Sequence, residues 1–302
     1  MSKKNKTLPD FFINAFYESK FRDNLFIVKA SGSVIEDEHA RNNLIANIRE
    51  LTLHGIKVIL IYGGGEMIDA AVEKRGIGVK RQNGRRVTDS ATLDIIKEVI
   101  GGQLSLSIYE AMQHNKLEGL SFNAVPADWM HVVLRPKKPI DYGFVGDIHG
   151  INIRPILRQL KVTGFIACPC LSITEDGALC NINADTIATA LATGLKADKL
   201  IFMSNVDGVK VDGKTAMMIS SGDITGLIDD GIVTDGMKVK MENCLGALNA
   251  GVKRIHLING LRDNALHKEI FESVGPGTML LRSEEEESYM NEVEVQKAIG
   301  GK

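Results

Sequence analysis

Several charged and amide side chains stand where they are costly unless they meet a ligand. Lys29 ends a short apolar run that is typical of a buried strand, and a lysine there is expensive to bury unless it faces a site. Lys240 falls in the opening of a predicted helix, where a cation opposes the helix dipole unless an anion lies nearby. Asn181, Asn183 and Asp185 give the start of another helix more polar groups than one N-cap needs. This pattern favours a site for an anionic ligand over ordinary capping and solvated lysines.

A run of three glycines adds a second kind of anion-binding element. Gly63, Gly64 and Gly65 follow an apolar strand pattern at residues 58–62 and precede a helical pattern. Consecutive glycines between a strand and a helix expose backbone N–H groups at the positive end of the helix, which is a common way to hold phosphates. A plain tight turn is the alternative. The chain carries no Walker sequence, no nucleophile elbow and no histidine-rich metal pattern.

The elements that would position these residues alternate between strands and helices. Strand patterns occupy residues 26–29, 58–62, 164–167, 200–204, 254–258 and 278–281, and helical patterns occupy 38–53, 66–75, 89–114, 152–160, 183–195, 222–229, 238–250 and 264–272. Alternation of this kind predicts an α/β fold, a three-layer αβα sandwich with a mostly parallel central sheet. Ligands of such sheets bind at the carboxyl ends of the strands, where Lys29 and the glycines would meet. A further helix is expected over residues 8–20.

Composition excludes several classes of protein. The 302 residues are 44% hydrophobic and 25% charged, with a formal net charge of −2, so nothing points to a nucleic-acid partner. No apolar run could span a membrane and no signal-peptide core is present, which predicts a cytoplasmic protein without a membrane partner. The four cysteines lack metal-ligand spacing and are expected to be buried thiols, with no metal site. Basic residues cluster within 80–86, as a solvated face or as a site for a small acidic substrate.

The order of the motifs resembles the amino-acid kinase family, and within it the N-acetylglutamate kinase branch. The matching segments are residues 29–32, 62–65, 83–89, 143–146, 181–185, 204–208 and 235–240. Each segment is a weak signal, but the ordered set is specific and spans most of residues 8–282. The resemblance implies a kinase-like domain over residues 24–282, preceded by a helical extension at 1–23. The acidic run from Glu284 to Glu287 near the end of the chain predicts a mobile tail at 283–302.

This resemblance implies a phosphoryl transfer from ATP to the side-chain carboxylate of N-acetyl-L-glutamate, in arginine biosynthesis. Lys29 and Lys240 would neutralise the phosphoryl group in transit, and Asp185 would hold both lysines in place. Arg86 would clamp the α-carboxylate of the acceptor, and Asn181 would bind its other polar end. The backbone of Gly63, Gly64 and Gly65 would meet the phosphoryl group and the acceptor carboxylate.

The resemblance divides the domain into an acceptor lobe at residues 24–180 and an ATP lobe at residues 181–282. The residues it implies for ATP are Lys29, Gly32, Ser204, Asn205, Gly208, Val209, Gly236, Met237 and Lys240. Mg²⁺ would be held through the phosphates with few protein ligands.

The two ends of the chain are similar to arginine-inhibited members of the family. Tyr17, His267, Glu269 and Gly275 would form the arginine site, and the helix over residues 8–20 would join subunits into a homo-oligomer, a dimer or a hexamer. A helix that merely covers a sheet edge is the alternative.

Two positions depart from the family pattern. Ser31 replaces a glycine beside the phosphates, and Tyr62 stands where the kinases usually have histidine. These departures leave two alternatives open. One is a non-catalytic arginine-sensing domain related to the kinase-like domain of N-acetylglutamate synthase. The other is a kinase for a different acceptor, such as aminoadipate on a carrier protein.

Overall fold

One eight-stranded sheet forms the centre of the molecule in the computed structural model, which describes residues 19–272 and 275–299. Its spatial order is β14-β16-β15-β11-β1-β2-β8-β5. In chain order the strands are β1 (Leu25–Ala30), β2 (Lys57–Tyr62), β5 (Leu120–Ser121), β8 (Phe165–Pro169), β11 (Lys199–Ser204), β14 (Met218–Ser220), β15 (Arg254–Asn259) and β16 (Thr278–Leu281). Neighbours run parallel except β15 and β16, so the predicted mostly parallel sheet is confirmed.

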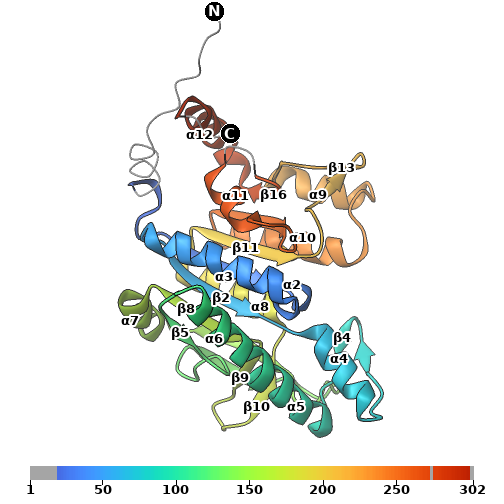
Figure 1. Ribbon diagram of the computed structural model, residues 1–302. Coiled ribbons are helices and arrows are strands. Elements are labelled where there is room, and N and C mark those ends of the chain that lie inside the picture. Colours follow the sequence, from blue (N-terminus) through green and yellow to red (C-terminus); the bar gives the residue numbers. More distant parts are fainter. Residues whose placement is uncertain (1–18, 273–274, 300–302) are drawn as a thin grey trace, which may run out of the picture.

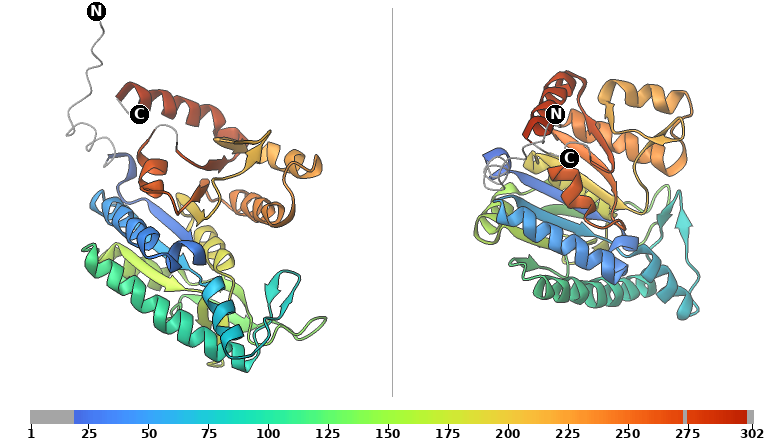
Figure 2. Two further views of the ribbon diagram at one scale, coloured as in Figure 1. Left: turned by 45° about the vertical axis from the view of Figure 1, so that its right-hand side comes forward. Right: turned by 45° about the horizontal axis from the view of Figure 1, so that its top comes forward.

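Helices cover both faces of this sheet, as right-handed crossovers require. The connections β1–β2 and β2–β5 move along the sheet in one direction, which places α3 (Glu38–Leu53) and α6 (Ser105–His114) on one face. The connections β8–β11 and β11–β15 move in the opposite direction, which places α8 (Ala184–Leu195) and α10 (Asp235–Asn249) on the other face. Figures 1 and 2 show the resulting three layers. The expected αβα sandwich is therefore confirmed.

Further helices and hairpins complete the fold. The helices are α2 (Gly32–Glu36), α4 (Gly65–Lys74), α5 (Ser90–Ile96), α7 (Ile153–Thr163), α9 (Ser221–Asp229) and α11 (Ala265–Phe271). The hairpin strands are β3 (Arg81–Gln82) with β4 (Arg85–Arg86), β6 (Met130–Leu134) with β7 (Gly146–Ile151), β9 (Leu171–Ile173) with β10 (Leu179–Asn181), and β12 (Lys210–Val211) with β13 (Lys214–Thr215). Asn83 and Gly84 both take positive φ at the tip of β3–β4, as an Asn-Gly hairpin turn requires.

The long helix expected over residues 89–114 is present, but its middle is a π-helical segment, η1 (Lys97–Leu104). Ser105 follows this segment, and its hydroxyl donates to the carbonyl of Ile100 at 2.8 Å. The hydroxyl of Tyr62 lies 3.0 Å from the same Ser105 oxygen. The strand that carries the glycines is thus tied by a buried polar contact to the helix that covers it.

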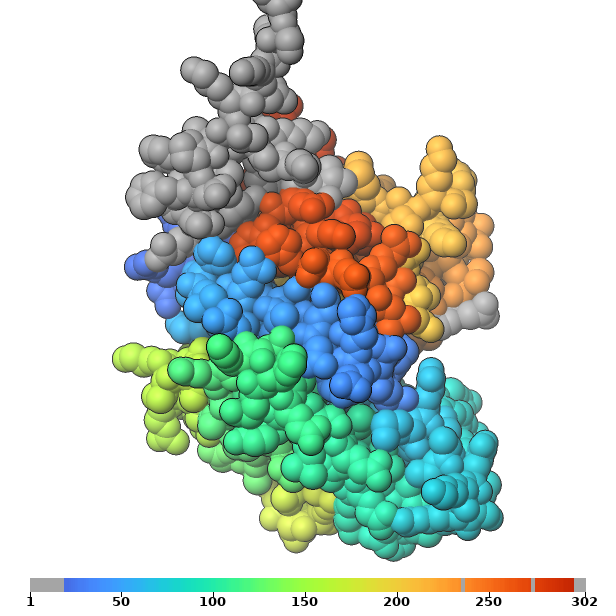
Figure 3. Space-filling view, viewed as in Figure 1, coloured from blue at the N-terminus to red at the C-terminus, as the bar shows by residue number. Residues whose placement is uncertain are grey.

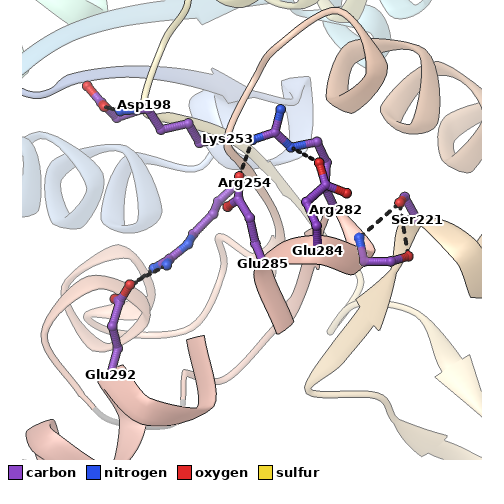
Figure 4. A network of polar contacts seen from close by, with 9 residues as sticks. Asp198, Ser221, Lys253, Arg254, Arg282, Glu284, Glu285 and Glu292 are labelled. Atoms are coloured by element: carbon purple, nitrogen blue, oxygen red, sulfur yellow. Dashed lines mark hydrogen bonds and ion pairs between the residues drawn. The ribbon is translucent and has the colours of Figure 1, made fainter. Parts of the chain in front are cut away.

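The mobile tail predicted from Ser283 onward is wrong. A short 3₁₀ turn (Ser283–Glu285) leads into α12 (Glu286–Ile299). The guanidinium of Arg254 on β15 binds the Glu292 carboxylate with distances of 3.0 and 2.5 Å, and Lys20 Nζ lies 3.1 Å from the same side chain. Figure 4 shows Arg254 reaching from the sheet to Glu292. The acidic run predicted a solvated segment, but Arg254 and Lys20, which are distant in sequence, pair with Glu292 on the helix.

The helix expected over residues 8–20 falls almost entirely outside the described residues, which begin at Ser19. Within the described part of the chain, no helix combines the length and the apolar character needed to cross a bilayer.

Candidate active site

An ion pair at the carboxyl edge of the sheet is the centre of the site. Lys29 lies near the end of β1, which is hydrogen-bonded to β2 on one side and β11 on the other. Asp185 lies in the first turn of α8, whose N-cap Asn183 accepts from the N–H of Thr186 at 3.1 Å. Lys29 Nζ is 2.8 Å from Asp185 Oδ1, and the lysine side chain is only 12% exposed. The costly lysine noted in the sequence therefore meets a carboxylate.

Lys240 joins this pair from the second turn of α10. It lines a cavity of about 520 Å³ together with Asp185, which we call the lysine-lined cavity. Burial lowers the pKa of Lys240, while Asp185 opposes the change. For Asp185, burial raises the pKa, but the charges of the two lysines outweigh it and leave this pKa below its ordinary value. Two lysines thus share one ionised carboxylate, which leaves positive charge for an anionic ligand.

A second cavity of about 290 Å³ adjoins the first, and we call it the glycine-lined cavity. It brings together most of the residues expected to bind the phosphoryl group and the acceptor: Lys29, Gly32, Gly63, Gly64, Gly65, Arg86, Asn181 and Asp185. Figure 3 shows the outline of the molecule indented between the hairpin region around residues 65–90 and the part beyond residue 200. Lys29 and Asp185 therefore stand at the inner end of a space large enough for a small acid.

Asp69 on α4 fixes the arginines of this cavity, and the sequence analysis missed it. Its carboxylate accepts from Arg86 and, at 2.7 Å, from Arg81, while Arg86 also donates to the Gly65 carbonyl at 3.1 Å. Burial raises the pKa of Asp69, but the two arginines lower it further, so this pKa lies below its usual value. Asp69 follows Gly65 by one helical turn, which is the signal that could have placed it beside the glycines.

Close backbone approach explains two of the glycines. A Cβ on Gly64 would lie 2.3 Å from Leu104 Cδ1, and a Cβ on Gly32 would lie 2.9 Å from the Gly65 nitrogen. The N–H of Met67, in the first turn of α4, donates to Glu36 Oε1 at 3.3 Å. Glu36 thus accepts from one backbone N–H at the start of α4, and this N–H is not available to a phosphate.

Four of the six remaining ATP residues lie around a third cavity of about 370 Å³, the loop cavity. These are Asn205, Gly208, Val209 and Met237. Gly208 has φ of +121° and a Cβ there would lie 2.4 Å from Thr278 Oγ1, so only glycine fits. Ser204 does not line this cavity, and Gly236 lies in the first turn of α10. Met237 and Lys240 are one turn apart on α10, which links this cavity to the charged centre.

The residues expected to bind arginine are only partly brought together. Glu269 and Gly275 line a separate cavity of about 400 Å³ beneath α12, the C-terminal cavity. His267 faces elsewhere, because its ring nitrogen lies 2.8 Å from Glu50 on α3. Tyr17 lies outside the described residues.

Buried charges line the wall of this C-terminal cavity. Lys199 Nζ is 3.0 Å from His256 Nε2, and His256 Nδ1 is 2.6 Å from Glu269 Oε1. Burial, with the charge of Arg254, lowers the pKa of Lys199 to about 7. Burial and the charge of Lys199 lower the pKa of His256 to about 4. The cavity wall therefore carries a glutamate, an imidazole and a lysine, and burial favours the neutral forms of the imidazole and the lysine.

Tyr62 does not line the cavities of the candidate site. Its side chain is fully buried against the helix that covers β2 and lines none of these cavities. Burial raises the pKa of its phenol. The departure from the family pattern at Tyr62 is thus a feature of the core.

The second departure, Ser31, is the N-cap residue of α2. Its hydroxyl lies 2.8 Å from that of Ser33.

Fold and site together define an α/β protein with two lysines and an aspartate between adjoining cavities, an arrangement suited to phosphoryl transfer by charge neutralisation. Residues 24–259 match the model of the amino acid kinase family, and the chain belongs to this family. It is 34% identical to an acetylglutamate kinase of Trichormus variabilis over 273 residues, with 89% of this chain and 91% of that protein covered. An acetylglutamate kinase of Campylobacter hominis is 31% identical over 283 residues, covering 93% and 99%.

Solved structures confirm the fold. N-acetylglutamate synthase from Neisseria gonorrhoeae, complexed with coenzyme A and N-acetyl-glutamate, superposes with a TM-score of 0.81 at 23% identity. The match covers 90% of this chain and 63% of the synthase. The protein smu.665 from Streptococcus mutans superposes with a TM-score of 0.71 at 26% identity, covering 85% and 98%.

Proposed function

We propose that the chain transfers the γ-phosphoryl group of ATP to the side-chain carboxylate of N-acetyl-L-glutamate. The observation that carries this proposal is the Lys29–Asp185 pair, 2.8 Å apart, where the glycine-lined cavity meets the lysine-lined cavity. The curated relatives named acetylglutamate kinase, matched over most of their length, support this acceptor. The cavity of about 290 Å³ with arginines at its wall suits a small dicarboxylate.

In the proposed reaction a carboxylate oxygen of the acceptor attacks the γ-phosphorus of ATP, and the bond to the β,γ-bridging oxygen breaks. ADP leaves with that electron pair, the product is an acyl phosphate, and no proton is transferred. Lys29 and Lys240 neutralise the equatorial oxygens, while Asp185 pairs with Lys29 and places its negative charge near Lys240. Arg86, fixed by Asp69, binds the α-carboxylate of the acceptor, and Asn181 binds its amide end.

ATP would bind along the loop cavity, where Gly208 lets the nucleotide lie close to the backbone. Met237 lines this cavity one helical turn before Lys240, so the phosphates would extend towards Lys240. Bound Mg²⁺ supplies positive charge to the phosphate oxygens. Among the described residues no group of three His, Cys, Asp or Glu side chains could hold a metal ion, and Asp185 is occupied by Lys29. A metal ion bound through the phosphate oxygens of the nucleotide fits this site, because such an ion needs few protein ligands. We also propose the division into an acceptor lobe (24–180) and an ATP lobe (181–282).

Trapping the product with hydroxylamine tests the proposal. Wild-type protein with ATP, Mg²⁺, N-acetyl-L-glutamate and hydroxylamine should form a hydroxamate, which is detected as its coloured ferric complex. Lys240→Ala, like Lys29→Ala, should lower the rate by about 100-fold or more, because the transition-state charge loses a neutralising group. Lys238→Ala is the matched control, since Lys238 is exposed on the same helix and lines neither adjoining cavity. Absence of hydroxamate from the wild type at saturating substrates refutes the proposal.

We further propose arginine as an effector that binds in the C-terminal cavity beside Glu269 and Gly275. Arginine should raise the melting temperature, because ligand binding to the folded state stabilises it, whereas citrulline, which lacks the guanidinium charge, should not. Equal melting temperatures with and without arginine reject this site. If arginine stabilises a chain that forms no hydroxamate, the non-catalytic sensing function replaces the kinase. The homo-oligomer joined through residues 8–20 belongs to the same proposal and rests on the sequence alone.

A further inference from the structure

Arg85, at the tip of the β3–β4 hairpin, is a charge that the proposed mechanism does not use. It is exposed, and it lines both the glycine-lined cavity and the lysine-lined cavity. Its neighbour Arg86 also lines the glycine-lined cavity, but it does not line the lysine-lined cavity. Arg86 reaches Asp69 on α4, whereas Arg85 lies across the cleft from α8 and α10.

The ion pairs of the glycine-lined cavity single out Arg85. Its wall has five cations, and four of them pair with carboxylates of the described residues. Lys29 pairs with Asp185, Arg81 and Arg86 share Asp69, and Arg135 binds Asp147 at 2.5 Å. No ion pair joins Arg85 to any residue within 19–272 or 275–299. An unpaired guanidinium at the mouth of two cavities is available to a ligand.

The opposite wall of the lysine-lined cavity indicates which ligand group Arg85 meets. That wall carries Lys240 from α10 and the polar side chains of Thr186 and Asn243. Its carboxylate, Asp185, is already paired with Lys29. Two cations therefore face one space from opposite lobes, with no free carboxylate between them. A group with several negative oxygens suits this space, and guanidinium binds phosphate oxygens bidentately.

Resting on the proposed function, we propose that Arg85 is a further catalytic residue that binds the γ-phosphoryl group of the nucleotide opposite Lys240. The hairpin brings this charge from the acceptor side, so phosphoryl transfer is neutralised from both sides of the cleft. Arginines that contact a transferred phosphoryl group raise kcat by about 10³–10⁵-fold in other phosphotransferases. The competing role is recognition of the acceptor, because Arg85 also lines the glycine-lined cavity.

Direct nucleotide binding separates these roles. Calorimetric titration with Mg²⁺ and either AMP-PNP or ADP should show that Arg85→Ala weakens AMP-PNP by about tenfold and ADP by less than about twofold. The kcat should fall by about 100-fold, with the acceptor KM within about twofold of wild type. Arg85→Lys should retain part of the AMP-PNP affinity, since lysine keeps the charge without the bidentate fork.

Lys80→Ala is the charge-matched control. Lys80 stands just before β3, its Nζ is 3.6 Å from Asp89, and it lines neither cavity. It should leave both affinities unchanged. An equal loss for AMP-PNP and ADP, no loss for either, or a raised acceptor KM with intact nucleotide binding overturns the proposal.

Nucleotide binding also separates this proposal from the proposed function. If the wild type forms no hydroxamate but Arg85→Ala selectively weakens AMP-PNP, the contact with the γ-phosphoryl group stands and the acceptor is wrong. If the wild type binds neither nucleotide, both proposals fall.

Discussion

Glu292 on α12 allows the strength of a long-range contact to be worked out. Burial raises the pKa of this carboxyl, but Arg254 and Lys20 outweigh it and lower the pKa from 4.5 to about 2. A difference of about 2.5 in pKa, at about 1.4 kcal/mol for each, sets a ceiling of about 3.5 kcal/mol on the stabilisation at neutral pH. The Glu292 side chain is 32% exposed, so solvent screening reduces the expected value to about 1.5–2 kcal/mol.

The pH dependence follows from the direction of this pKa change. Because the folded carboxyl has the lower pKa, its stabilisation is complete above about pH 5 and disappears as the pH falls towards 2. Glu292→Gln should therefore cost about 1.5–2 kcal/mol at pH 7. At pH 4 the cost should be about 0.8 kcal/mol smaller, since the unfolded wild-type carboxyl then takes up a proton.

Amide hydrogen exchange of the α12 peptides, corrected for intrinsic rates, measures this free energy whether the helix opens alone or with the whole chain. Glu294→Gln is the matched control, because Glu294 is exposed on the same helix. It should change the opening free energy by less than about 0.5 kcal/mol. The reasoning is refuted if Glu292→Gln behaves like this control at pH 7, or if its cost stays constant between pH 7 and pH 4.

Three further substitutions test the site and its support. Asp69→Asn should raise the acceptor KM by about tenfold with kcat little changed, because Arg86 loses its orienting charge, and a fall in kcat alone would contradict this role. Tyr62→Phe should cost about 1 kcal/mol in urea unfolding and leave activity intact, whereas lost activity would place its hydroxyl in the chemistry. Gly64→Ala should lower stability by about 1–3 kcal/mol, since the new Cβ meets Leu104 at 2.3 Å, and an unchanged melting temperature would show that the helix yields.

Local sequence signals predicted most of the fold. Apolar strands ending in glycine or a polar residue identified β1, β2 and β11, and the helical spacing of apolar residues identified α3. Each of these signals lies within one helix or strand, so it can be recognised without knowing which elements pack against it. The antiparallel placement of β16 against β15 depends on how two elements meet, and the sequence does not specify it.

The two largest surprises are tertiary. The acidic run at the start of α12 resembles a solvated tail, but Arg254, 38 residues upstream, binds Glu292 on this helix. Tyr62, which stands where the kinases usually have histidine, is buried and its hydroxyl contacts Ser105, because the face of a fully apolar strand cannot be told from its composition. The charged centre was easier to predict, since Lys29 and Asp185 are costly residues in their local context.

Lys29 stands on a strand that is hydrogen-bonded along both edges, in a sheet that runs unbroken from β14 to β5. The two halves of the molecule therefore share one continuous hydrogen-bonded sheet. The β3–β4 hairpin is a separate two-stranded sheet that lines the site. The central sheet fixes the position of Lys29, whereas Arg85 and Lys240 reach the adjoining space from elements outside the central sheet. Stiffening the hairpin should thus leave the position of Lys29 undisturbed.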